Sequence, residues 1–123
     1  MQVKDCVLIE AFKCNENENV VEVAKKLSEV TLRHIFVADD NEYPVGIISV
    51  LDINNRVVAE NKNLAETTAK DVMSAPIRVA KMEEDAKTLA DEMIKNSWVM
   101  TPVVNEENKM VGIVTLNQLM QNE

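Results

Sequence analysis

The chain has 123 residues, of which 46% are hydrophobic and 28% charged, with a formal net charge of −8. No apolar run approaches the roughly 18 to 20 residues of a membrane-spanning helix, so we expect no membrane insertion. The acidic balance argues against nucleic acid as a partner, because a phosphate backbone is bound by clustered lysine and arginine side chains. Residues 1–5 lack the basic and then apolar profile of a secretory signal, which predicts a cytoplasmic protein.

The first half of the chain contains both helical and strand patterns. Residues 20–27 place apolar side chains on one helical face, and Asn19 before them is a good N-cap. Two apolar runs flank the acidic turn of residues 39–42, as in two strands joined by a tight turn. In chain order the patterns predict strand, helix, strand, strand and helix at residues 9–13, 20–27, 35–38, 45–50 and 52–60.

The second half repeats this order 66 residues later. The offset superposes the only two glycines, Gly46 and Gly112, together with the apolar residues around them. Residues 61–68 form the seam between the copies, and residues 68–73 have the pattern of a capped helical turn. The second copy predicts strand, helix, strand, strand and helix at residues 76–79, 86–93, 101–104, 110–116 and 117–121. The continuous apolar strands favour burial on both faces by helices.

Four segments of the chain carry residues of a known motif. They are Val45-Gly46-Ile47-Ile48-Ser49-Val50-Leu51-Asp52, then Thr101-Pro102-Val103-Val104-Asn105 with Val111-Gly112-Ile113-Val114-Thr115, and Asp71-Val72-Met73-Ser74-Ala75-Pro76 at the opening of the second copy. Each copy thus has an apolar strand that ends at an acidic turn, followed by a hydrophobic-Gly-hydrophobic-hydrophobic-Ser/Thr segment. This pattern resembles the CBS domain, and two copies in tandem resemble a Bateman module.

The resemblance implies a mixed α/β (α+β) fold of two CBS repeats, each strand-helix-strand-strand-helix, packed with pseudo-twofold symmetry. It implies a single Bateman module at residues 1–123, with repeat 1 at residues 5–62 and repeat 2 at residues 68–123. It also implies a homodimer that regulates an enzyme or transporter. Clefts between the repeats of such modules commonly bind AMP, ADP, ATP or S-adenosylmethionine.

The resemblance places a ligand-binding hydroxyl and carboxylate at Ser49 and Asp52, where the third strand passes into a helix. A carboxylate can accept hydrogen bonds from both hydroxyls of a cis-diol, so Asp52 is expected to hold a ribose. The alternative is that Ser49 and Asp52 only cap the helix, and the two roles are compatible.

Two further pairs of residues distinguish the copies. Thr115 and Gln118 stand at the equivalent positions of the second copy, where a neutral amide replaces the carboxylate and predicts a second, degenerate site. Arg33 and His34 precede the second strand, where nucleotide-binding relatives often have basic residues that reach phosphates. Their alternatives are a solvated surface arginine and a structural histidine, and Val99-Met100 takes their place in the second copy.

The expected function is that of a non-catalytic sensor, which binds an adenosine-containing ligand and acts on a partner in trans. The alternative is a protein–protein interaction module that binds no small molecule. The sequence offers no nucleophile with a base, no metal-ligand set and no phosphate-binding lysine motif, so we expect no catalysis, no metal site and no required cofactor. Cys6 and Cys14 match no zinc or redox spacing and are expected to be buried, reduced thiols.

Overall fold

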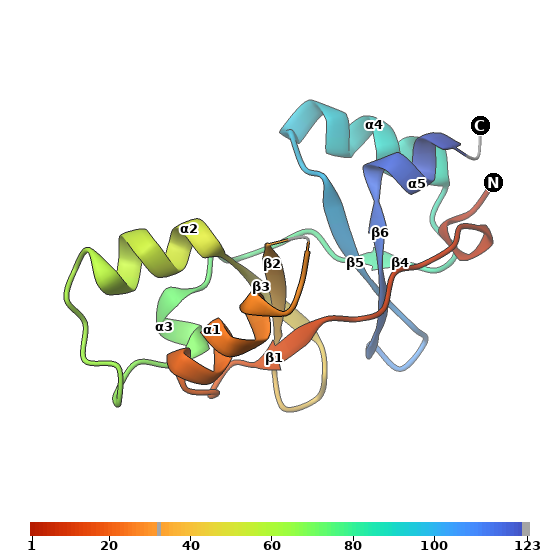
Figure 1. Cartoon of the computed structure of the whole chain (residues 1–123). Helices are drawn as coiled ribbons and strands as arrows, with labels where there is room; N and C mark the ends of the chain where they lie inside the picture. The colour runs from red at the N-terminus through yellow and green to blue at the C-terminus, as the bar shows by residue number, and fades with distance from the viewer. Residues whose placement is uncertain (32, 122–123) are drawn as a thin grey trace. The chain divides into compact units, whose positions relative to one another are not determined.

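The computed structural model describes residues 1–31 and 33–121, which form two compact units (Figure 1). The first unit is Phe12–Ile77, and the second unit combines Met1–Ala11 with Arg78–Glu123. The N-terminal segment therefore packs with elements of the second copy. The repeat boundaries at residues 5–62 and 68–123 stay a prediction, because compact packing and sequence repetition need not divide a chain at the same residues.

The first unit holds a three-stranded sheet in the order β1-β2-β3. Strand β1 is parallel to β2, and β2 is antiparallel to β3, with His34 paired to Ser49. Its strands are β1 (Lys13–Asn15), β2 (His34–Ala38) and β3 (Pro44–Ser49). Its helices are α1 (Val20–Ser28), α2 (Val50–Ile53) and α3 (Ala69–Val72), and the π-helix η2 (Asn54–Val58) continues α2.

Local signals explain several of these boundaries. The side chain of Asn19 accepts a hydrogen bond from Val21 N over 2.9 Å, which confirms the predicted N-cap of α1. The prediction of a first strand at residues 9–13 is wrong, because β1 begins only at Lys13. Ile9 instead exchanges two backbone hydrogen bonds with Ile113, of 2.8 and 2.9 Å, in the second unit.

The core of the first unit lies between its helices and one face of its sheet. Alternate residues of the hairpin point into this core, as the two-residue period of strands requires, and they include Ile35, Val37 and Ile48. Phe36 and Ala38 on the opposite face of β2 are buried as well, while the helices of the unit pack on the first face, so the prediction that helices cover both faces stays a prediction. The helical residues of the cluster are Val20, Val23, Leu27, Val57, Ala69 and Val72.

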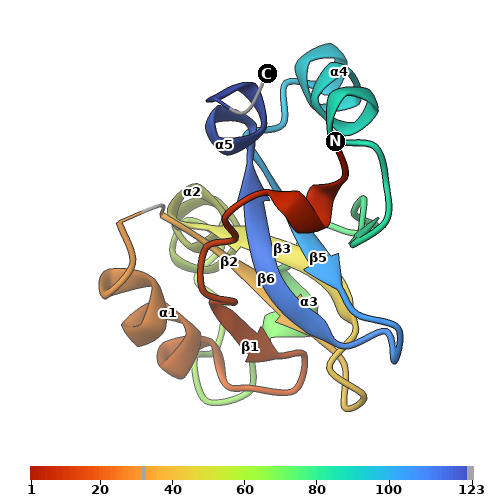
Figure 2. The ribbon, with the colours of Figure 1, turned by 90° about the vertical axis from the view of Figure 1, so that its right-hand side faces the viewer.

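The second unit has the same topology, with sheet order β4-β5-β6, a parallel first pair and an antiparallel second pair. Its strands are β4 (Ala80–Lys81), β5 (Met100–Val104) and β6 (Met110–Thr115), and its helices are α4 (Ala86–Asn96), α5 (Leu116–Gln121) and the 3-10 helix η1 (Val3–Asp5). The N-terminal segment runs along β6, and α4 lies beside α5 (Figure 2). The first strand again begins later than the predicted residues 76–79.

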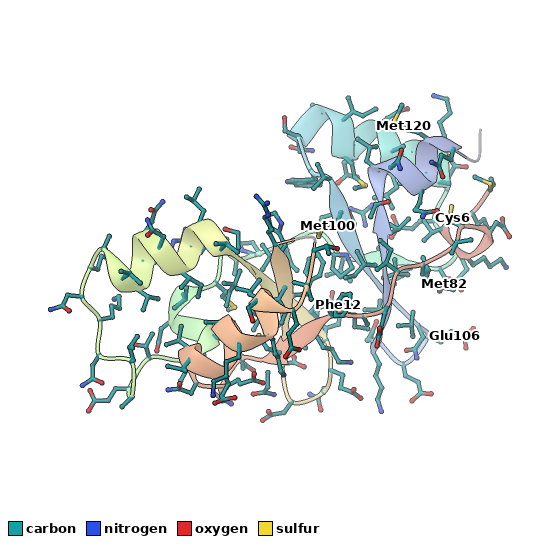
Figure 3. All side chains as sticks on the ribbon, in the orientation of Figure 1. Cys6, Phe12, Met82, Met100, Glu106 and Met120 are labelled. Atoms are coloured by element: carbon teal, nitrogen blue, oxygen red, sulfur yellow. The ribbon has the colours of Figure 1, made fainter. Side chains whose placement is uncertain are left out.

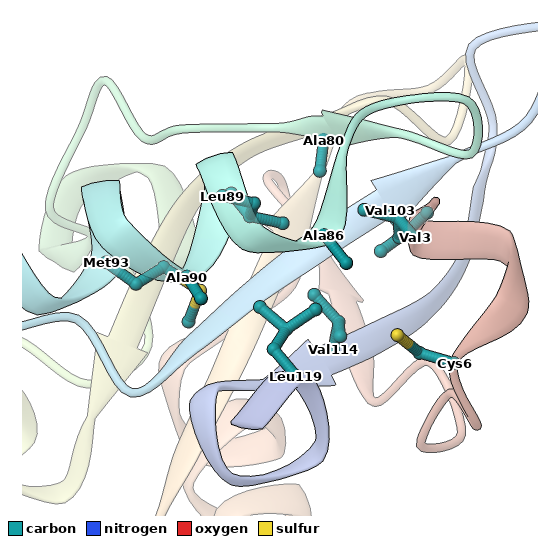
Figure 4. Packing of buried hydrophobic residues seen from close by; sticks show 10 residues of the cluster. All are labelled: Val3, Cys6, Ala80, Ala86, Leu89, Ala90, Met93, Val103, Val114 and Leu119. Carbon is teal, nitrogen blue, oxygen red and sulfur yellow. The ribbon is translucent and has the colours of Figure 1, made fainter. Parts of the chain in front are cut away.

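Helix α4 supplies much of the core of the second unit. Its residues Ala86, Leu89, Ala90 and Met93 face Val114 and Leu119 (Figure 4). Of the other methionines in this unit, the labelled Met82 packs against the cluster and Met120 is exposed (Figure 3). No helix among residues 1–31 and 33–121 is both long and apolar enough to cross a membrane.

The two superposed glycines have a packing role in each sheet. A Cβ atom at Gly46 would lie 2.8 Å from Met73 Cγ, and one at Gly112 would lie 2.9 Å from Leu8 Cβ. Neither glycine has a positive φ. Each glycine therefore lets a neighbouring chain segment pack closely on the third strand of its unit, rather than allowing an unusual backbone conformation.

Candidate functional site

Ser49 and Asp52 form a capping box where β3 passes into α2. Asp52 N donates to Ser49 Oγ over 3.1 Å. In return, Ser49 N and Ser49 Oγ donate to Asp52 Oδ2 over 2.8 and 3.1 Å. The capping interpretation is therefore correct for the local structure. The capping box uses only Oδ2 of the carboxylate, and Oδ1 lies outside it.

That second oxygen, Asp52 Oδ1, faces Arg56. Arg56 Nε lies 3.7 Å from Asp52 Oδ1, and the Asp52 side chain is 19% exposed. This distance exceeds a hydrogen bond, so the guanidinium stabilises the charge while Oδ1 keeps its capacity to accept hydrogen bonds from a ligand. The sequence interpretation missed Arg56, although its spacing of four residues from Asp52 on a helical segment is a signal for such a pair.

Arg33, His34 and Ser49 come together at one cavity of about 570 Å³. Its size is within the range of small-molecule sites. Arg33 has a φ of 60°, and its carbonyl accepts a hydrogen bond from Val50 N over 3.2 Å, which fixes the backbone before β2 to the start of α2. Asp52 is not among the described lining residues, which are Arg33, His34, Ser49, Val50, Leu51 and Asn54.

The equivalent place in the second unit keeps the backbone arrangement and changes the chemistry. Leu116 N donates to the carbonyl of Val99 over 2.9 Å, as Val50 N does to that of Arg33. Gln118 N donates to Thr115 Oγ1 over 3.1 Å, so Thr115 caps α5 as Ser49 caps α2. Gln118 brings a neutral amide to the position of the carboxylate, and Val99 and Met100 bring no charge.

Other polar groups of the first unit are engaged in pairing. A second cavity of about 320 Å³ is lined by charged residues that bind one another, with Lys13 Nζ 3.2 Å from Glu42 Oε1 and Lys26 Nζ 2.9 Å from Glu18 Oε1. Cys14 at its edge is buried, and burial raises the pKa of its thiol to about 12, so it is not a nucleophile at neutral pH.

Both cysteines are free and buried, as expected from their spacing. Burial also raises the pKa of Cys6. In the part of the chain that the structure describes, no group of three or more histidine, cysteine, aspartate or glutamate residues is arranged to hold a metal ion.

Comparison with known proteins identifies the fold. The sequence profile of the CBS domain matches residues 3–59 and 69–122. The CBS domain pair of protein MJ0100, in complex with 5′-methylthioadenosine and S-adenosyl-L-methionine, is 28% identical. That structure aligns with a TM-score of 0.77, covering 99% of this chain and 94% of the other.

Two longer proteins contain a similar region. An uncharacterized protein of Methanopyrus kandleri is 29% identical over 106 residues, which are 86% of this chain and 54% of that protein. The L-aspartate semialdehyde sulfurtransferase of Methanocaldococcus jannaschii is 30% identical over 113 residues, which are 92% of this chain and 21% of the enzyme. The chain thus spans about half and about a fifth of the length of these relatives.

The profile matches both halves of the chain, and each half has the same element order and sheet topology. The chain belongs to the CBS domain family and contains two CBS domains in tandem.

Proposed function

We propose that this CBS domain pair is a regulatory module that binds an adenosine-containing ligand, namely AMP, ADP, ATP or S-adenosylmethionine. The observation that carries the proposal is the Asp52 carboxylate, which is ionisable, partly exposed and has one oxygen outside the capping box. Similarity over nearly the whole chain to a domain pair in complex with two adenosine compounds supports it.

The residues of the first unit suit the parts of such a ligand. Asp52 Oδ1 accepts hydrogen bonds from ribose hydroxyls, and hydrogen bonds to a charged group contribute roughly 1.5 to 3 kcal/mol. Arg33 is exposed beside the cavity, and a guanidinium stays charged at every physiological pH, which suits it to a phosphate or carboxylate. His34 lines the same cavity and is the second candidate for that role.

Thr115 and Gln118 form the weaker of two sites under this proposal. An amide oxygen has no charge and accepts fewer hydrogen bonds from a cis-diol than a carboxylate does. We therefore expect one high-affinity binding event for each chain.

Titration calorimetry with AMP, ADP, ATP, S-adenosylmethionine and 5′-methylthioadenosine tests the proposal. At least one should bind with a micromolar dissociation constant, a free energy of about −8 kcal/mol. Asp52→Asn should weaken it by at least about tenfold because the charge is lost. Absence of binding to all five compounds would refute the proposal.

Asp85→Asn is the matched control, because the Asp85 carboxylate also caps a helix, α4 of the second unit. Thr88 N and Thr88 Oγ1 donate to Asp85 Oδ2 over 3.0 and 2.9 Å, as Ser49 N and Ser49 Oγ donate to Asp52 Oδ2. If loss of a capping carboxylate were enough to weaken binding, Asp85→Asn would act like Asp52→Asn. We expect Asp85→Asn to bind as the unchanged protein does.

A second candidate function is that of an interaction module without a small-molecule ligand. It is favoured by the apolar surface of α2 and η2, where Val50, Leu51 and Val58 are 48%, 65% and 66% exposed. We propose that this surface serves a homodimer or a regulated enzyme or transporter in the cytoplasm. Sedimentation of the chain and of Val58→Glu tests this surface, and association that Val58→Glu abolishes, together with absence of nucleotide binding in the calorimetry, would favour the second candidate.

A further inference from the structure

We propose that Arg56 is the positioning residue of the candidate site, and that it couples the Asp52 carboxylate to the segment Val72–Ser74. The inference rests on the proposed function for its ligand, while the coupling is a property of the first unit alone. Arg56 contacts Asp52 within its own helical segment and two carbonyls of another segment.

The guanidinium of Arg56 is bound to the end of α3. Arg56 Nη1 donates to the carbonyl of Val72 over 2.9 Å and to that of Met73 over 3.2 Å. Carbonyls at a helix end lack partners within the helix, so a cation there satisfies them and is favoured by their partial negative charge. These bonds hold the half-exposed Arg56 side chain in place. A single exposed ion pair on a helix surface would not hold it, because such pairs contribute little stability.

The position of Arg56 decides which oxygen of Asp52 is available. Asp52 Oδ2 accepts both hydrogen bonds from Ser49, and Asp52 Oδ1 faces Arg56 Nε at 3.7 Å. A fixed positive charge at this distance attracts Oδ1 without forming a hydrogen bond to it. The lone pairs of Oδ1 therefore stay available to a ligand. Arg56 also lies in the π-helix η2, and single π-helical turns are frequent at functional sites.

The segment Val72–Ser74 completes a closed ring of contacts. Ser74 exchanges backbone hydrogen bonds of 2.9 and 3.1 Å with Ile47 of β3, two residues before Ser49. The ring therefore runs from Ser49 through Asp52, Arg56, Val72–Met73 and Ser74 back to β3. A ligand that binds Asp52 changes the contact of Asp52 with Arg56, and through Arg56 it acts on the segment Val72–Ser74 of the same unit.

The first test uses a ligand without phosphate, so that contact of Arg56 with phosphate cannot explain the result. We compare binding of 5′-methylthioadenosine and its 2′-deoxy analogue by calorimetry. The unchanged protein should prefer the ribose form by about tenfold, and Arg56→Ala should reduce this preference to below about threefold. Arg56→Lys, which keeps the charge, should restore part of it. An equal loss of affinity for both compounds would overturn the inference, because it would indicate a structural role only.

Lys87→Ala is the matched control. Lys87 and Asp91 form another ion pair four residues apart, with Nζ 3.3 Å from Oδ2, on an exposed face of α4. Its removal should leave the preference for ribose unchanged. If Arg56→Ala does not fold, as judged by circular dichroism, Arg56→Gln replaces it, since an amide keeps a donor for the carbonyls while it removes the charge.

A ligand-free measurement separates this inference from the proposed function. Amide exchange at Ser49 reports its bond to Asp52, and exchange at Ser74 reports its bond to Ile47. Arg56→Ala should accelerate both by at least about fivefold, because local opening becomes easier. Unchanged exchange at both would overturn the coupling. If the unchanged protein binds neither nucleoside and none of AMP, ADP, ATP and S-adenosylmethionine, the proposed function fails and the exchange result alone decides the role of Arg56.

Discussion

The two units have one topology and different polar chemistry. In the first, Ser49 and Asp52 share a reciprocal capping box, whereas the second has Thr115 with Gln118 at the same place. The backbone bond that joins the start of the helix to the residue before the second strand is present in both. Both helices thus begin at a capping hydroxyl, and the units differ in the residue three positions later, which is a carboxylate in the first and a neutral amide in the second.

A second comparison concerns the ion pairs at the start of α1 and of α4. In the second unit Arg78 binds both Glu84 and Glu92, with Nε 3.0 Å from Glu92 Oε2. In the first unit Lys26 binds Glu18, with Nζ 2.9 Å from Oε1. Phe12 and Lys26 occupy the positions equivalent to Arg78 and Glu92. The cation therefore comes from helix α1 in the first unit, and from the segment before α4 in the second.

The largest expected effect is on the core of the second unit. Leu89→Ala should reduce the free energy of unfolding by about 2 to 5 kcal/mol, because the Leu89 side chain is only 1% exposed and its removal leaves a cavity. Denaturant unfolding measures the total loss of stability, and amide exchange at Val114 shows whether the loss lies in the core of the second unit. Val23→Ala is the counterpart in the first unit, because Val23 stands 66 residues before Leu89 and is buried. A loss below about 1 kcal/mol for Leu89→Ala would contradict the packing described for α4.

The second largest effect is expected when the residues at positions 52 and 118 are exchanged, because this changes which unit carries the carboxylate. Asp52→Gln should reduce the free energy of ligand binding to the first unit by roughly 1.5 to 3 kcal/mol. Gln118→Asp should give the second unit a carboxylate at the equivalent position. Calorimetry should then report a second binding event for Gln118→Asp. If Gln118→Asp leaves the stoichiometry unchanged, the asymmetry of the sites does not depend on this carboxylate.

The ion pair of Arg78 with Glu84 makes the stability of the second unit depend on pH. Hydrogen bonding to Arg78 holds the pKa of Glu84 below its usual 4.5. A lowered pKa stabilises the fold fully at pH values above 4.5, and this contribution is lost as the pH falls through the pKa of the folded state. Glu84→Gln should cost about 1 kcal/mol at pH 7 after allowance for solvent screening, and less at pH 3. Equal costs at both values, from urea unfolding, would contradict this.

The smallest effect distinguishes the two cysteines without changing stability. Cys14 is 2% exposed with a pKa of about 12, and Cys6 is 7% exposed. Only the thiolate reacts with iodoacetamide, so at pH 8 both should react slowly and Cys14 more slowly than Cys6. Mass spectrometry of the labelled peptides measures the two rates. Faster labelling of Cys14 would indicate that β1 opens more readily than η1.

Much of the fold follows from periodicity and capping. The predicted helix of residues 20–27 is α1, and the predicted hairpins are β2 with β3 and β5 with β6. The first strand of each copy was misplaced because β1 and β4 are short and are defined by parallel pairing with β2 and β5, which no local pattern encodes. The apolar residue Ile9 was assigned to a strand of the first copy and pairs with Ile113 instead.

The candidate site was predictable in part. Ser49 and Asp52 are near in sequence, so their capping box follows from spacing alone. Arg33, His34 and Ser49 meet at one cavity because β2 and β3 are antiparallel, which the hairpin pattern already indicated. Ligand binding by these residues stays a prediction, because the hairpin pattern determines which residues lie close together and does not determine what they bind.

The sequence by itself determined the repeat, the starts of α1 and α4, and the family, because these depend on residues close to one another in the chain. Only the tertiary structure decided that Arg56 reaches Val72 and Met73, and that Met1–Ala11 packs with Arg78–Glu123. Contacts between distant residues depend on how the elements assemble, and a periodic pattern records which face of an element is buried without naming the segment that covers it.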